Sequence, residues 1–233
     1  MIVTKGLRVD ALGEPLFENV NLVLRAGERV GIVGTRTSEV TTFLRVIAGE
    51  EEQDDGTVSC EGERVAYVSP ETLRGGTEAL ARVLHARPSF LLLDAAGITL
   101  PAEIEPIKRF IATFRGGVLL ASEDAGLMAA ARAARILEIH AATKVVSSYT
   151  GSYADYAVER EKNLTRMNEA YEKQQKEKRR LEDWLTQKRK EAANDRSPEK
   201  GATIRTKTKY LQREILDKEI PKPIQPESAD AAD

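Results

Sequence analysis

The most constraining feature of this chain is an apolar strand that runs into a glycine and then into an amphipathic helix. The strand is expected over Glu28–Val33, the glycine is Gly34, and the helix is expected over Thr41–Ala48. Strand, loop and helix in this order form the structural context of the phosphate-binding motif G-x-x-x-x-G-K-[ST]. The sequence therefore predicts an α/β fold built around such a loop.

Much of the chemistry of that motif is missing. With Gly34 as the first glycine, Glu39 stands at the second glycine and Val40 stands at the lysine. Val40 has neither a donor nor a charge for phosphate. Thr41 keeps the hydroxyl that would bind magnesium. Fold and activity therefore have to be argued separately.

Glu39 is the most disruptive of these changes. It is expected to direct a negative charge at phosphates, and two like charges about 4 Å apart repel by roughly 1–4 kcal/mol. The nearby cations that could offset this charge are Arg36 and Arg74.

Residues 1–140 alternate between strand and helix patterns. Strands are expected at Gly6–Val9, Val20–Leu24, Val30–Val33, Arg64–Val68, Phe90–Leu93, Gly117–Ala121 and Arg135–Ile139. Helices are expected at Thr41–Ala48, Thr77–Ala86, Glu103–Phe114 and Gly126–Ala134. Two of the strands are continuous apolar runs, which is typical of strands covered on both faces. The alternation predicts a layered α/β domain with a largely parallel sheet.

The composition sets limits on function. The 233 residues carry 35 Lys/Arg and 37 Asp/Glu, and 41% are hydrophobic, which supports a packed core but no uniformly basic surface. The single cysteine, Cys60, excludes a disulfide framework, and His85 and His140 lack metal-ligand spacing. No signal-peptide pattern and no apolar run of about 18 residues is present, so we expect no membrane partner and a cytoplasmic location.

The composition changes near Gly151, where a long charged segment begins. Side chains there recur at alternating spacings of three and four, the pattern of a heptad seam: Leu164, Met167, Tyr171, Gln174, Lys178, Leu181 and Leu185. The pattern is broken over Ala192–Gly201 and then resumes at Ile204, Thr208, Leu211 and Ile215. Residues 151–220 are therefore predicted to form an antiparallel helical hairpin, a linker-like coiled coil. Residues 221–233 are predicted to be a disordered tail.

Together these segments resemble one ATP-binding cassette of the ABC-F family followed by its linker. The tetrapeptide that begins at Leu73 resembles the Leu-Ser-Gly-Gly signature, and Leu80–Asp94 resembles the helix and strand that lead to the Walker B aspartate. Gly151–Tyr156 and Tyr171–Lys176 resemble the linker that joins tandem cassettes, which is the more specific signal. The resemblance implies a P-loop ATP-binding-cassette-like domain over residues 1–150. Only Glu71 and Thr72 separate Pro70 from the signature-like Leu73, so most of the family's helical subdomain is expected to be missing.

The departures from the family pattern fall on catalytic positions. Ala95 stands where the family has the glutamate that polarises water, and loss of a general base typically lowers a rate about 10²–10⁴-fold. Glu123 replaces the switch histidine, while Pro70 and Pro101 replace a glutamine and an aspartate. We therefore expect a pseudo-ATPase and assign no catalytic residue.

The resemblance implies ATP and magnesium as cofactors, placed by motif position alone. The implied nucleotide-binding residues are Gly34, Thr35, Arg36, Thr37, Ser38, Glu39, Val40, Thr41, Thr42 and Asp94. Thr41 and Asp94 are the implied magnesium ligands. A structural interpretation is also open: Gly34 makes a turn, Thr41 caps the helix, and Asp94 ends a buried strand.

The charged segment is the basic part of the chain. Glu159–Lys218 holds 18 Lys/Arg and 12 Asp/Glu, a charge of +6, so the remainder carries −8 of the total −2. The candidate RNA-binding residues are Lys178, Arg179, Arg180, Lys188, Arg189, Lys190, Arg196, Lys200, Arg205, Lys207 and Lys209. In ABC-F translation factors this linker reaches into the ribosome beside tRNA, so the resemblance implies ribosome, tRNA or rRNA as the partner. The structural alternative is an ordinary solvated coiled coil.

We predict a degenerate ABC-F-like protein that is a non-hydrolysing, ribosome- or RNA-associated binding module, with translation as the process it would modulate. One alternative is an ATP-binding ABC-F ATPase with residual nucleotide binding. Others are a structural scaffold that pairs with a second cassette or forms a homodimer, a decaying paralogue, and a protein that binds branched DNA. A transporter motor is the least favoured, because the linker resembles ABC-F.

Overall fold

The computed structural model describes residues 1–34, 36–194, 198–218 and 220, with the backbone alone for 192–194, 198–201 and 214. Contacts within the chain separate two compact units, Met1–Val158 and a second that begins at Glu159. We refer to them as the cassette and the hairpin. The predicted tail, 221–233, lies outside the described residues.

The cassette contains two sheets. A three-stranded antiparallel sheet has the order β2-β1-β4 and consists of β1 (Ile2–Ala11), β2 (Glu14–Leu24) and β4 (Asp55–Ser59). A six-stranded sheet has the order β5-β6-β7-β3-β8-β9. Its strands are β3 (Arg29–Gly34), β5 (Val65–Val68), β6 (Phe90–Asp94), β7 (Gly117–Ala121), β8 (Arg135–Ile139) and β9 (Val146–Thr150). All neighbours in this sheet are parallel except β8 and β9, so the predicted largely parallel sheet is confirmed.

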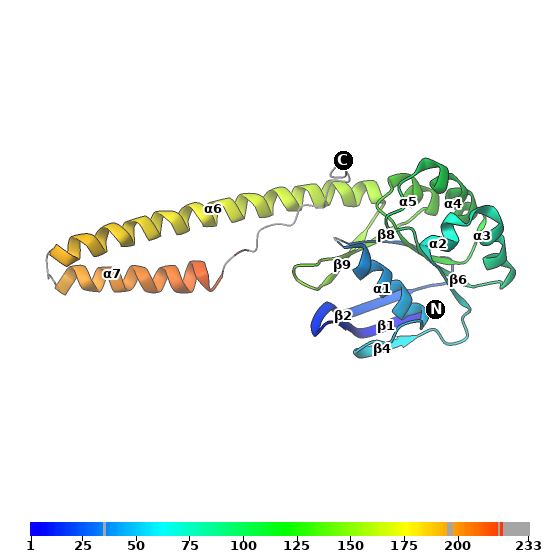
Figure 1. Cartoon of the computed structure of the whole chain (residues 1–233), viewed down its shortest axis with the longest axis horizontal. Coiled ribbons are helices and arrows are strands. Elements are labelled where there is room, and N and C mark those ends of the chain that lie inside the picture. The colour runs from blue at the N-terminus through cyan, green and yellow to red at the C-terminus, as the bar shows by residue number, and fades with distance from the viewer. Residues whose placement is uncertain (35, 195–197, 219, 221–233) are drawn as a thin grey trace. The chain divides into compact units, whose positions relative to one another are not determined.

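Helices cover both faces of the six-stranded sheet. Helix α1 (Thr37–Ala48) packs between it and the three-stranded sheet, as Figure 1 shows. The opposite face carries α2 (Pro70–Arg74), α3 (Gly76–His85), α4 (Pro101–Thr113) and α5 (Ala125–Ala131). Because strand side chains alternate between faces, Leu92 packs on the α1 side while Leu91 and Leu93 pack on the other.

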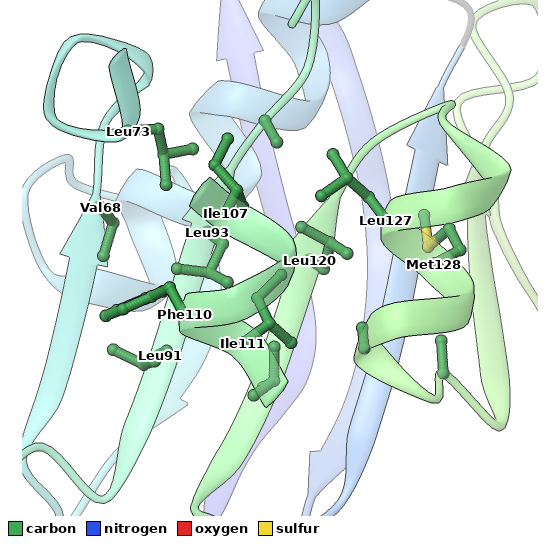
Figure 2. Packing of buried hydrophobic residues seen from close by; sticks show 14 of the residues in the cluster. Val68, Leu73, Leu91, Leu93, Ile107, Phe110, Ile111, Leu120, Leu127 and Met128 are labelled. Carbon is green, nitrogen blue, oxygen red and sulfur yellow. The ribbon is translucent and has the colours of Figure 1, made fainter. Parts of the chain in front are cut away.

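The core on the α2–α5 side is continuous from strand to helix. Figure 2 shows Ile107, Phe110 and Ile111 of α4 directed at the sheet, where Leu93 and Leu120 lie. These α4 positions repeat at three and four residues, so one apolar stripe of the helix is buried. The packing fixes the carboxyl ends of β6 and β7, from which the candidate site is built.

The structure differs from the sequence prediction at several element boundaries. Strands β4 and β9 and the short helix α2 were not predicted. The first two predicted strands belong to the separate antiparallel sheet rather than to the parallel one. Only α2 stands between β5 and α3, which agrees with the predicted loss of the helical subdomain.

The hairpin consists of α6 (Tyr153–Asn194), α7 (Pro198–Tyr210) and a π-helical turn, η1 (Leu211–Leu216). Its small core contains Leu185, Leu211 and Ile215, with Trp184 packed against it. Gln174 is hydrogen-bonded to the backbone of Lys218 and Ile220, so earlier residues of α6 meet later residues of the return segment. The predicted antiparallel hairpin is confirmed.

Two details of the hairpin prediction are wrong. Met167 was placed in the seam but is 43% exposed. The tip is shorter than Ala192–Gly201, because α6 continues to Asn194 and α7 begins at Pro198. Proline is well suited to the first turn of a helix, so Pro198 starts α7 rather than extending the loop.

Candidate functional site

The loop between β3 and α1 is short. Strand β3 ends at Gly34 and α1 begins at Thr37, so only positions 35 and 36 connect them. The sequence predicted a helix start at Thr41, one turn later. A second glycine would favour an open loop there, whereas Ser38, Glu39 and Val40 continue the helix at a lower conformational cost.

Val40 packs onto the glycine of the motif. A Cβ atom built on Gly34 would lie 2.6 Å from Val40 Cγ2, closer than two carbon atoms approach in proteins. Val40 is also buried in the core around α1. The position expected to carry the phosphate-binding lysine therefore forms part of the core.

Glu39 is fully buried and lies beside two cations. Its Oε1 atom is 3.5 Å from the Lys144 ammonium and 3.9 Å from the Arg36 guanidinium. Neither carboxylate oxygen has a hydrogen-bond partner among the described residues. Glu39 was predicted to face phosphates with Arg36 and Arg74 as counter-charges. The prediction is wrong for Arg74, which pairs with Glu103 of α4, and it missed Lys144.

Lys144 is held in place by its backbone as well as its side chain. It lies in the β8–β9 turn with a positive φ of 61°, a conformation that costs a non-glycine residue about 1 kcal/mol or more. Its N–H donates to the His140 carbonyl at 2.7 Å, and its carbonyl accepts from the Glu18 N–H at 2.9 Å. The Lys144–Glu39 pair thus connects α1 to the β8–β9 turn, and the hydrogen bond from Glu18 connects this turn to β2.

Thr41 and Asp94 are brought together, as their motif positions imply. The Thr41 hydroxyl donates to Asp94 Oδ2 at 2.7 Å, and the Tyr67 hydroxyl donates to the same oxygen at 3.1 Å. Asp94 Oδ1 accepts from the Ala96 N–H at 3.3 Å. Because α1 begins at Thr37, Thr41 lies inside the helix, and the interpretation of Thr41 as a helix cap is wrong.

The Asp94 carboxylate is shielded from solvent and hydrogen-bonded by neighbouring residues. Asp94 is fully buried at the end of β6. Burial, and then the Asp94 charge, raise the pKa of the Tyr67 hydroxyl, so Tyr67 remains a donor to the carboxylate. Both carboxylate oxygens are already satisfied by the chain. A magnesium ion, which prefers six oxygen ligands in octahedral geometry, would have to displace these hydrogen bonds.

A cavity of about 410 Å³ opens at the carboxyl ends of β3, β6 and β7. Its position is where ligands of doubly wound sheets bind, because α1 leaves β3 on one face while the connections of β6 and β7 leave on the other. Apolar side chains, hydroxyl groups and acids line it, including Val40, Ala95, Ser122, Glu123 and Asp124. None of the described residues that line it is basic.

ATP and magnesium do not fit these residues. The side chains that would hold phosphate are missing: Val40 stands at the lysine position, Lys144 is paired with Glu39, and the acids Glu123 and Asp124 line the cavity. The described residues contain no cluster of three or more metal-binding side chains either. We derive no hydrolytic step for this site.

The remaining motif residues have structural roles in the cassette. Ala95 is buried, and its N–H donates to the Ala121 carbonyl. Asp124 caps α5 by accepting from the Leu127 N–H at 2.6 Å. Glu123 is exposed, as expected of a solvated loop acid, and Pro70 begins α2.

The other nucleotide-binding positions are divided between surface and interior. Arg36, Thr37 and Ser38 are exposed, Thr42 is half-buried, and Thr35 lies outside the described residues. Thr41 and Asp94 are therefore hydrogen-bonded to each other, whereas the described side chains at positions 36–38 face solvent.

Most of the predicted RNA-binding cations of the hairpin face solvent. The exposed ones are Arg179, Arg180, Arg189, Lys190, Arg205, Lys207 and Lys209. Lys178 is half-buried, and Lys188 is half-buried and paired with Glu191 at 2.6 Å. Arg196 lies outside the described residues, as does the side chain of Lys200. Lys176, which the prediction omitted, is exposed one helical turn before Arg180.

Comparison with known proteins agrees with this fold. A family model described as "ABC transporter" matches residues 139–226. The dimeric structure of MJ0796, a bacterial ABC transporter cassette, superposes with a TM-score of 0.53 at 16% identity, covering 64% of this chain and 98% of that one. The chain resembles an ATP-binding cassette.

Two curated relatives support the same relationship. The hemin import ATP-binding protein HmuV of Rhodopseudomonas palustris is 32% identical over 108 residues, 44% of this chain and 40% of that protein. The probable ATP-binding protein YbiT of Escherichia coli O157:H7 is 23% identical over 204 residues, 65% of this chain and 38% of that protein. The cassette-like chain thus spans about two fifths of the length of each relative. No described helix combines the length and hydropathy that a membrane span requires.

Proposed function

We propose that this chain is a non-hydrolysing, ABC-F-like protein that associates with ribosomes or RNA through its hairpin. The observation that carries the proposal is the set of exposed arginine and lysine side chains on α6 and α7. In the cassette, by contrast, the phosphate-binding positions are occupied by the core and by an internal ion pair. Residues 159–218 carry a net charge of +6, whereas the rest of the chain carries −8.

The electrostatics favour phosphate contacts of low sequence specificity. Exposed Arg and Lys side chains neutralise nucleic-acid phosphates and release counterions, so affinity falls steeply with salt. The cassette contributes a folded support whose loop acids, Glu123 among them, do not attract phosphate. Nucleotide hydrolysis is not part of this function, because Ala95 has no group that could polarise water.

The test is co-sedimentation of the full chain with purified ribosomes at low and high salt. We expect pelleting at about 50 mM salt that is largely lost at about 300 mM. A variant in which four exposed hairpin cations become glutamine should no longer pellet: Arg189, Lys190, Arg205 and Lys209.

A matched control changes four exposed arginines of the cassette to glutamine: Arg25, Arg82, Arg109 and Arg115. This control should pellet like the unmodified chain. Equal loss of pelleting in both variants would show that net charge alone matters, and an absence of pelleting at low salt would overturn the proposal.

A further inference from the structure

The hairpin carries the chain's single tryptophan between two surface depressions. One depression, of about 270 Å³, lies between α6 and α7 and is lined by Arg180, Trp184, Lys207 and Tyr210 among others. The second, of about 550 Å³, runs along α6 and also includes Arg180 and Trp184, together with Lys176. Trp184 and Arg180 thus belong to both depressions.

Trp184 is held in place without being buried completely. It packs against the small core of Leu185, Leu211 and Ile215, yet its half-exposed side chain still lines the surface. An aromatic ring fixed in this way gives up little conformational entropy when a ligand stacks on it. The ring is therefore available for a planar partner.

Positive charge surrounds the ring on both helices. Lys176, Arg180 and Trp184 follow at intervals of four residues, so the two cations lie on the same side of α6 at steps of about 6 Å along its axis. On α7, the Lys207 ammonium lies 5.8 Å from the Tyr210 ring centroid, a cation–π arrangement at the edge of the first depression.

Among the described residues that line the two depressions, positive side chains outnumber negative ones. Glu177 accepts a hydrogen bond from the Tyr210 hydroxyl at 3.2 Å. Asp183 lies in the second depression beside Lys176 and Arg179. Two acids therefore face four cations, because Lys207 and Arg180 complete the set.

We infer that Trp184 is a stacking site for one unpaired base of a single-stranded RNA segment. Lys176 and Arg180 contact phosphates on one side of that base, and Lys207 contacts a phosphate on the other. Proteins that bind single strands combine a positively charged groove with aromatic side chains in this way. A duplex keeps its bases stacked internally, so the site selects unpaired RNA. The inference rests on the proposed function and specifies its ligand.

The closing experiment uses Trp184 as its own reporter, because the chain contains one tryptophan. The full chain is titrated with a fluorescently labelled 12-nucleotide oligouridine and, separately, with a 12-base-pair RNA duplex. Anisotropy of the label measures binding, and tryptophan emission measures stacking. We expect quenching by the single strand, little quenching by the duplex, and weaker binding of the duplex.

Substitution at the site separates stacking from charge. Trp184→Leu should lower affinity for the single strand by about 5- to 150-fold, the range measured for loss of one stacked base, and leave duplex affinity within about twofold. Trp184→Phe keeps a ring and should restore most of the affinity. Arg180→Gln keeps the tryptophan and should weaken both RNAs, and circular dichroism verifies that each variant retains its helices.

Each contrary result has a distinct meaning. Single-strand binding without quenching, and unchanged by Trp184→Leu, would overturn the stacking site but leave the proposed function standing. No binding to either RNA at low salt would overturn both. Equal quenching by a polyglutamate peptide would replace RNA by an acidic protein segment as the ligand.

Discussion

The cassette and the hairpin differ in the burial of the charged residues singled out above. In the cassette, Glu39 and Asp94 are fully buried and their partners are other residues of the same unit. In the hairpin, most of the candidate cations are exposed, and among the described residues the buried core consists of Leu185, Leu211 and Ile215. At the motif positions of the cassette, Glu39 and Asp94 thus contact other residues of the cassette, whereas most of the candidate cations of the hairpin face solvent.

The largest expected effect concerns the internal ion pair of the cassette. Lys144→Met leaves the buried Glu39 carboxylate with only the Arg36 guanidinium, at 3.9 Å. We expect the free energy of unfolding to fall by about 3 kcal/mol, because a buried charge that loses its partner is strongly destabilising. Methionine adopts the positive φ of this turn no more easily than lysine, so the backbone strain stays the same. Urea unfolding followed by circular dichroism measures the change.

A double variant and a surface control sharpen this prediction. Glu39→Gln combined with Lys144→Met removes both charges and should recover most of the lost stability. Lys108→Met breaks the pair with the exposed residue Glu105 and should cost far less than Lys144→Met, because exposed ion pairs contribute little to stability. If Lys144→Met lowers the free energy of unfolding no more than Lys108→Met does, the Lys144–Glu39 ion pair does not stabilise the cassette.

The next effect concerns the hairpin cations. Arg189→Gln combined with Lys190→Gln removes two exposed charges of α6. The slope of log affinity for single-stranded RNA against log salt should become less steep by about 1.4, since each phosphate contact contributes about 0.7. At 0.1 M salt this corresponds to a loss of about tenfold or more in affinity, measured by anisotropy. Arg82→Gln combined with Arg109→Gln, in the cassette, should leave the slope unchanged; an equal change would remove the distinction between the units.

The smallest effect concerns Tyr67, which donates to Asp94. Tyr67→Phe removes one of the three hydrogen bonds to this carboxylate and should cost about 1–2 kcal/mol at neutral pH. Because the pKa of Tyr67 is raised in the folded state, its contribution is fully present below about pH 10 and is lost as the pH rises further. Chemical unfolding of both proteins at pH 7 measures the cost of the substitution, and the same measurement at pH 10.5 or above tests whether that cost becomes smaller. A stability difference that grows above pH 10 would contradict the assigned hydrogen bond.

Local patterns in the sequence were sufficient for the central strands and for the hairpin. Leu91–Leu93 and Val118–Leu120 are short continuous apolar runs, which is typical of strands covered on both faces, and the seam through Leu181 and Leu185 continues at Leu211 and Ile215. Such features depend on spacing within one segment. They were therefore visible before the fold was known.

The contacts that close the candidate site were not visible in the same way. Lys144 lies more than one hundred positions after Glu39, and it reaches that residue only because β8 pairs with β3. Helix α1 begins at Thr37 because no glycine interrupts Ser38, Glu39 and Val40. A glycine would lower helix stability there, and hydrophobic spacing does not reveal such an effect. Tyr67 likewise meets Asp94 through the pairing of β5 with β6. Long-range pairing, rather than local propensity, decided the chemistry of this site.

If the hairpin binds RNA without help from nucleotide in the cassette, MgATP should leave the affinity for RNA unchanged. The most direct measurement is a titration of labelled single-stranded RNA with the full chain, at 0.1 M salt, with and without millimolar MgATP. We predict affinities that agree within about twofold, because Val40 packs into the core at the position of the phosphate-binding lysine and Glu39 is buried beside Lys144. An affinity that changes tenfold or more with MgATP, but not with magnesium alone, would contradict the account by showing that the cassette still responds to nucleotide.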